Sequence, residues 1–187
     1  MGACKRCGKK GLFLKLSAIG LCTDCQQRYD IEIPRENEII KESLKIVQSS
    51  PNLNTKISRC ELIIDTLKKM KNFGGDFDVI HDIGCDTGVD EMLSMYEDLY
   101  QILSKMKNNI ETVILECIDQ NGPSSKQSFI DYYNSDNTKY IRDETDDDLI
   151  FDISKTLPDI LIEMEGHLDI KKNKTGSKYL YTFFGKE

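Results

Sequence analysis

The sequence predicts a mainly helical protein with a small β content. Apolar residues recur at helical spacing between residues 36 and 166. Two short apolar segments, residues 168–170 and 179–183, flank a basic stretch and predict one β-hairpin. A cysteine-rich segment occupies the N-terminus, where periodicity is weak. We therefore expect three parts, over residues 1–30, 34–108 and 110–187.

The N-terminal cysteines form two Cys-x-x-Cys pairs, Cys4 with Cys7 and Cys22 with Cys25. Two thiolates three positions apart can face one centre when the backbone between them turns tightly. Two such turns supply the four sulfurs, at about 2.3 Å, of a closed tetrahedral zinc site. The spacing therefore predicts one structural Zn²⁺, with an iron–sulfur cluster or rubredoxin-type iron as the alternative that uses the same ligands.

Other uses of the cysteines fit the sequence less well. Met1 runs straight into Cys4 and a basic stretch with no signal peptide, so we expect a cytoplasmic protein rather than one with a disulfide framework. The seven cysteines are an odd number, which excludes complete internal pairing. The remaining cysteines, Cys60, Cys85 and Cys117, are then expected to be reduced thiols.

The residues around the cysteines support a small metal-binding module. Gly8 follows the first pair and allows a turn, residues 11–20 predict a β-hairpin, and the second pair leads into a helix at residues 26–29. Five apolar residues of the hairpin are available to cover the metal: Leu12, Phe13, Leu14, Leu16 and Ile19. The order resembles a four-cysteine treble-clef or zinc-ribbon finger over residues 1–30. That resemblance implies metal binding and leaves the partner open.

The formal charge is unevenly distributed. The net value is −7, yet residues 1–30 carry +4, which four thiolates with Zn²⁺ would lower to about +2. A nucleic-acid interface normally needs about six or more phosphate contacts from one basic face. The candidate nucleic-acid contacts of the finger are Lys5, Arg6, Lys9 and Lys10.

Helical periodicity begins after Pro34, which we expect to interrupt the chain. Residues 36–49 predict one helix, with Ile39, Ile40, Leu44 and Val47 on one side. Asn54 and Thr55 are expected to cap a second helix, whose inward residues are Ile57, Cys60, Ile64 and Leu67. The two helices predict a helical hairpin.

The segment after the second helix carries side chains that could form another site. Residues 76–80 predict a short strand or connector. His81, Asp82 and Cys85 follow, and a His–Cys–Asp cluster could in principle activate a thiol. Their spacing matches no metal signature, and we expect a loop. A long amphipathic helix is predicted over residues 89–107. Asn108 and Asn109 mark a weak point, and further apolar stripes follow over residues 110–118 and in a short helix over residues 124–133.

The C-terminal part begins with an acidic run, residues 143–148, which we expect to be a solvated loop. A helix then begins near Leu149, Pro158 starts the next helix, and Gly166 ends it. Over residues 157–183, a helix, a strand, a basic turn and an aromatic strand resemble the wing of a winged-helix domain. The helices from about residue 110 would complete that domain, so the resemblance covers residues 110–184. The candidate nucleic-acid contacts of that wing are Lys171, Lys172, Lys174 and Lys178.

One departure from the winged-helix pattern bears on function. The helix before the wing enters the major groove in DNA-reading members and carries cationic or amide side chains. Here the same helix carries Asp159, Glu163 and Glu165. We therefore expect a protein-contacting version of the domain or a structural remnant of it.

The sequence favours a binding protein over an enzyme. It has only two histidines and no phosphate-binding glycine loop, and a closed four-cysteine site leaves no coordination position for catalysis. We expect a non-enzymatic intracellular zinc protein that acts as a protein-interaction or regulatory adaptor. The alternative is a nucleic-acid-binding regulator. No apolar run approaches the roughly 18 residues of a membrane span, and no small-molecule substrate is evident.

Overall fold

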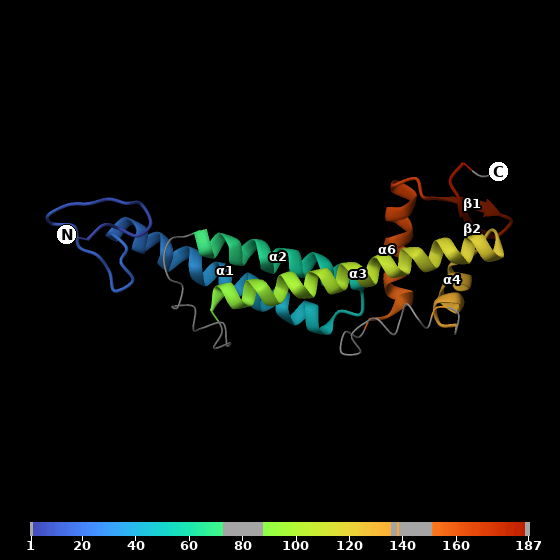
Figure 1. Ribbon diagram of the computed structural model, residues 1–187, viewed down its shortest axis with the longest axis horizontal. Coiled ribbons are helices and arrows are strands. Elements are labelled where there is room, and N and C mark those ends of the chain that lie inside the picture. Colours follow the sequence, from blue (N-terminus) through green and yellow to red (C-terminus); the bar gives the residue numbers. More distant parts are fainter. Residues whose placement is uncertain (1, 73–87, 136–137, 139–150, 186–187) are drawn as a thin grey trace. The chain divides into compact units, whose positions relative to one another are not determined.

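The computed structural model describes residues 2–72, 88–135, 138 and 151–185 (Figure 1). The elements are α1 (Thr23–Ser49), α2 (Leu53–Asn72), α3 (Val89–Asn121), α4 (Lys126–Tyr133), α6 (Ile153–Gly166), β1 (Ile170–Thr175) and β2 (Lys178–Phe183). The two strands form one antiparallel sheet. The prediction of a mainly helical chain with a small β content is confirmed.

The chain divides into two compact units. The first is Met1–Gln48 with Ser58–Tyr100, and the second is Ser49–Ile57 with Gln101–Glu187. This division differs from the three parts expected from the sequence, whose borders remain predictions. The segment around His81 and Cys85 and the acidic run at residues 143–148 lie outside the described residues.

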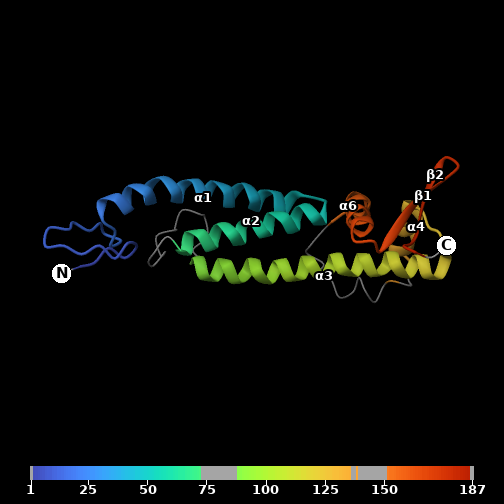
Figure 2. The same ribbon diagram turned by 90° about the horizontal axis from the view of Figure 1, so that it is seen from above.

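In the first unit, α1 continues through Pro34, so the break expected there is wrong (Figure 2). The exposed ring of Pro34 removes only one i→i−4 hydrogen bond. Ile33 and Ile40, on either side of the proline, are both buried, so the buried face of the helix continues through this position. Tertiary packing therefore outweighs the local cost of proline.

Helix α2 begins at Leu53, and its cap lies two to three residues before the expected positions. The side chain of Asn52 accepts a hydrogen bond from the N–H of Thr55 at 3.1 Å, so Asn52 caps the helix instead of Asn54 or Thr55. Within the first unit, the α2 lysines Lys68 and Lys71 form ion pairs with Glu97 and Asp90 of α3, at 2.9 and 2.6 Å. The buried face of α2 includes the predicted Cys60, Ile64 and Leu67.

Helix α3 is continuous from Val89 to Asn121, so the weak point expected at Asn108 and Asn109 does not interrupt it. Met106 and Ile110 are both buried, so the apolar face carries on across the two asparagines. The helix ends at Gly122, whose φ of 72° is accessible to glycine and whose N–H bonds to the carbonyl of Ile118.

The second unit has its core between α3, α4, α6 and the sheet. Phe129 of α4 packs on Tyr181 of β2 with ring centroids 5.8 Å apart, and both side chains are buried. Helix α6 starts after the capping side chain of Asp152 and includes Pro158, so one helix replaces the two expected around that proline. In the hairpin, Thr175 pairs with Lys178 around Gly176, whose φ of 64° suits a two-residue turn.

Within the described residues, no helix has the length and apolar character that would let it cross a bilayer.

Candidate metal centre

The first cysteine pair lies in a tight turn. The N–H of Gly8 donates to the carbonyl of Cys4 at 2.9 Å, and Gly8 has a φ of 69°, which a residue with a Cβ rarely adopts. The N–H of Cys4 donates to the carbonyl of Lys9, also at 2.9 Å. These bonds turn the backbone so that Cys4 and Cys7 face the same side.

The second pair lies at the start of α1. Cys22 immediately precedes the helix and Cys25 occupies its first turn. The N–H of Lys5 donates to the carbonyl of Gly20 at 3.0 Å, which ties the two cysteine-bearing segments together. Gly20 has a φ of 81°, which a residue with a Cβ rarely adopts, so the second segment also depends on a glycine.

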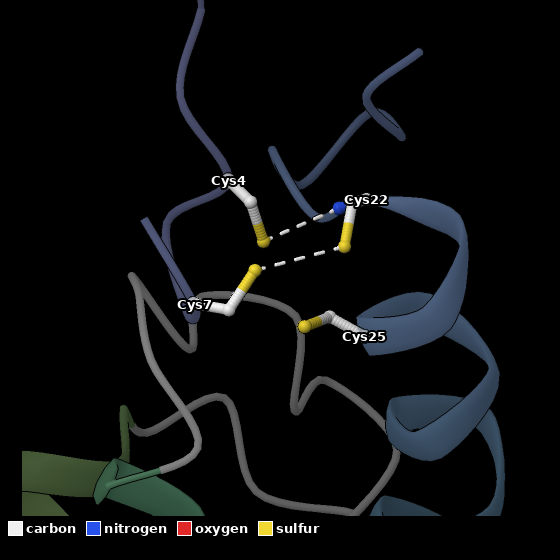
Figure 3. Close-up of side chains that lie close together, drawn as sticks. All are labelled: Cys4, Cys7, Cys22 and Cys25. Carbon is white, nitrogen blue, oxygen red and sulfur yellow. Dashed lines mark hydrogen bonds between the residues drawn. The ribbon is translucent and has the colours of Figure 1, made fainter. Parts of the chain in front are cut away.

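The four sulfurs converge on one point (Figure 3). All lie within 4.8 Å of one another, and the sulfurs of Cys7 and Cys22 are 3.8 Å apart. A tetrahedron with metal–sulfur bonds of about 2.3 Å has edges of about 3.8 Å. The donor set and its spacing therefore fit one metal ion, and the predicted grouping of Cys4, Cys7, Cys22 and Cys25 is confirmed.

The electrostatics of the centre differ between its sulfurs. Backbone N–H groups, first that of Cys7 and then that of Cys22, lower the pKa of the Cys4 thiol to about 6. Burial, and after it the neighbouring sulfur of Cys22, raises the pKa of Cys25 to about 12. Without a cation, the Cys4 thiol therefore loses its proton easily and the Cys25 thiol keeps it. A cation at the centre would lower the pKa of every thiol, because it stabilises all four thiolates at once.

Only part of the expected apolar cover is present. Leu14, Leu16 and Ile19 pack against the cysteine cluster. Leu12 and Phe13 instead point into solvent, with 79% and 96% of their surfaces exposed. Among the described residues of the finger, isolated bridges between Ala3 and Lys10 and between Leu16 and Cys22 replace the hairpin expected at residues 11–20.

The basic candidates are divided between the two units. Lys5, Lys9 and Lys10 are exposed in the first unit, where Arg6 is half-buried. Lys9 approaches Asp24 at 3.9 Å, a weak surface pair. The four lysines of the predicted wing are exposed in the second unit, on the strands themselves.

The acidic face of α6 has partners that sequence analysis missed. Asp159 accepts a hydrogen bond from the side chain of Asn52 at 2.8 Å. Glu163 accepts one from Asn54 at 2.9 Å and also pairs with Lys107. These contacts could not be predicted from the sequence, because the asparagines lie more than one hundred positions away from their acidic partners and the spacing of nearby residues does not reveal such pairs.

A second unforeseen contact joins the start of α4 to the sheet. The N–H of Ser124 donates to the carbonyl of Tyr181 at 3.0 Å, and the N–H of Tyr181 donates back at 2.8 Å. Ser124 thereby adds a one-residue bridge to the outer edge of β2. This bridge fixes the turn between α3 and α4 against the hairpin.

No protein-family model, curated protein or solved structure matches this chain.

Proposed function

We propose that the chain is a non-enzymatic, intracellular zinc-binding adaptor whose finger contacts another protein. The observation that carries this proposal is the exposed pair Leu12–Phe13, next to a four-cysteine centre that holds the surrounding loop. Large apolar side chains that stand fully in water often mark interaction sites. A closed metal site orders such a loop without contributing catalysis.

Zinc is the metal we assign to the centre. Four cysteine sulfurs at tetrahedral spacing are the donors of structural zinc sites. One pair lies in a glycine-containing turn and the other at the start of a helix, an arrangement that supports the treble-clef type of finger. Zinc bound there would make Leu12 and Phe13 a preformed contact rather than a loop that must order on binding.

The order of elements in the second unit supports a winged-helix-like fold, which we propose binds a protein instead of duplex DNA. The order of α3, the Ser124 bridge, α4, α6 and the hairpin follows that fold. Hydrogen bonds from Asn52 and Asn54 occupy Asp159 and Glu163, two acidic side chains of the helix that a DNA-reading member would use. These contacts favour protein binding over duplex reading.

The adaptor proposal is tested with the double variant Leu12→Ser/Phe13→Ser. Wild-type and variant proteins, both zinc-loaded, are used as bait for quantitative cross-linking capture from the native host. We expect the variant to keep its zinc and its helical content and to lose a specific protein partner. The matched control is Ile162→Ser, which changes an exposed apolar residue of the second unit and should keep the partner. An identical set of partners for all three proteins would refute the role of the finger tip.

Nucleic-acid binding is the second candidate, favoured by one observation. Residues 2–23 carry five cationic side chains and no acidic one. Fluorescence anisotropy with duplex and single-stranded oligonucleotides tests it, because phosphate contacts weaken as salt is added. Binding should be lost in Lys5→Gln/Lys9→Gln/Lys10→Gln, and an absence of binding at low salt would end this alternative.

A further inference from the structure

A cleft of about 530 Å³ lies in the second unit, between the start of α4 and the hairpin. Three lysines line it, Lys126 from α4 and Lys172 and Lys178 from the strands. No acidic residue is among its lining residues, and no ion pair joins these lysines to any residue that the structure describes. We refer to it as the basic cleft.

The walls of the basic cleft are held by contacts that need no ligand. Tyr181 is buried against Phe129 and bridged to Ser124 through its backbone. At the start of α4, the side chains and N–H groups of Ser125 and Ser128 form a reciprocal capping box. The cleft is therefore preformed, as small-molecule sites usually are.

The chemistry of the lining points to an anion attached to a flat group. Lysines that line one hollow place like charges near one another, and a phosphate group relieves that repulsion while accepting hydrogen bonds from the ammonium groups that reach it. Tyr179 lines the same cleft with a half-exposed ring, and the ammonium of Lys172 lies 4.5 Å from the ring centroid. Aromatic rings of this kind stack on nucleobases.

We propose that the basic cleft binds a mononucleotide, with its phosphate among the three lysines and its base against Tyr179. The volume is within the range of about 300–1,000 Å³ typical of small-ligand sites. A nucleic-acid strand would instead need phosphate contacts spread along a basic track. The neighbouring Lys171 and Lys174 do not line the cleft, so only two of the four hairpin lysines belong to it. The proposal is independent of the finger.

Isothermal titration of full-length, zinc-loaded protein with AMP tests the proposal. The variant Lys172→Gln/Lys178→Gln should bind AMP at least about tenfold more weakly, because two phosphate contacts are lost. The matched control Lys171→Gln/Lys174→Gln removes the same charge from the same hairpin and should change the affinity by no more than about twofold, the effect of long-range charge alone. An equal loss of AMP affinity in both variants would mean that binding depends only on the net charge of the hairpin, and it would overturn the proposal.

Two further variants separate the ligand contacts from structural effects. Tyr179→Ser should weaken AMP binding while leaving the weaker binding of inorganic phosphate unchanged. Lys172→Arg keeps the cation beside the ring and should retain AMP binding, and circular dichroism checks that every variant is folded. A failure of AMP to bind at about 10 mM, an affinity too weak for a specific site, would refute the proposal. So would binding seen only with a single-stranded oligonucleotide or only with a phosphotyrosine peptide.

Discussion

The backbone N–H of Cys22 donates a hydrogen bond to the sulfur of Cys4 at 3.3 Å. This bond joins the residue that precedes α1 to the turn that holds the first cysteine pair (Figure 3). N–H donors directed at a sulfur stabilise its thiolate, the form that binds a metal. The two halves of the centre are thus connected by a backbone hydrogen bond, in addition to any metal ion that their four sulfurs would hold together.

We expect native mass spectrometry to find one Zn²⁺ per chain and none in Cys4→Ser/Cys22→Ser, because the remaining two sulfurs cannot close a tetrahedral site. Leu12→Ser/Phe13→Ser is the control and should retain the ion, since both side chains point away from the cysteines. A cysteine variant that still carries one zinc ion would show that the ligands are assigned wrongly.

Zinc removal should disorder only the finger. The later part of α1 buries Ile40 and Val47, and α2 buries its own apolar face, so neither depends on the metal for its packing. Hydrogen exchange of the Cys4→Ser/Cys22→Ser variant should rise within residues 2–30 and stay unchanged in α2. A cooperative loss of protection throughout both regions would mean that the finger belongs to the main core.

Pro34→Ala should stabilise the first unit. The pyrrolidine ring lies within α1, where proline is less favourable than alanine by up to about 3 kcal/mol, and it is exposed, so little packing is lost. Urea unfolding followed by circular dichroism measures the gain. Glu42→Ala, at another exposed position of α1, should change the free energy of unfolding by less than about 0.5 kcal/mol. A destabilised proline variant would indicate that the helix requires a bend there.

Thr156→Val should destabilise the second unit by about 1–3 kcal/mol, the cost of a buried donor left without an acceptor. The hydroxyl of Thr156 accepts a hydrogen bond from the N–H of Leu53 at 3.0 Å, and both residues are fully buried. Valine keeps the shape but removes the acceptor. Thr175→Val, on the exposed part of β1, is the control and should be nearly neutral in the same urea titration. Equal effects at the two positions would show that the buried bond contributes nothing.

The capping residue of α6 makes part of the stability depend on pH. The hydroxyl and N–H of Ser154 donate to Asp152 and lower the pKa of its carboxyl below the ordinary 3.8. A lowered folded-state pKa stabilises the protein above pH 3.8, and this contribution is lost as the pH falls through the lowered value. The advantage of wild type over Asp152→Asn in urea should therefore shrink between about pH 6 and about pH 3. A difference that stays constant over this range would contradict the charge effect.

The metal centre and the element types were predictable from local patterns. Cys-x-x-Cys spacing depends on one turn and the apolar stripes on one helical repeat, so both are visible within a few residues. The same local reasoning failed at Pro34 and Asn108. Each residue weakens a helix locally, but the buried neighbours on either side, such as Ile33 and Ile110, keep the helix continuous.

The sequence by itself determined which four cysteines cluster, the mainly helical character and the C-terminal hairpin. Only the tertiary structure decided which side chains are exposed to solvent and which are buried or paired with another residue. Phe13 is exposed although its apolar neighbours Leu14 and Leu16 pack on the cysteines, and Asp159 is bound to Asn52 rather than facing solvent alone. The physical reason is that the exposure and pairing of a side chain depend on segments that are distant in the sequence. The spacing of neighbouring residues carries no information about which distant segments come into contact.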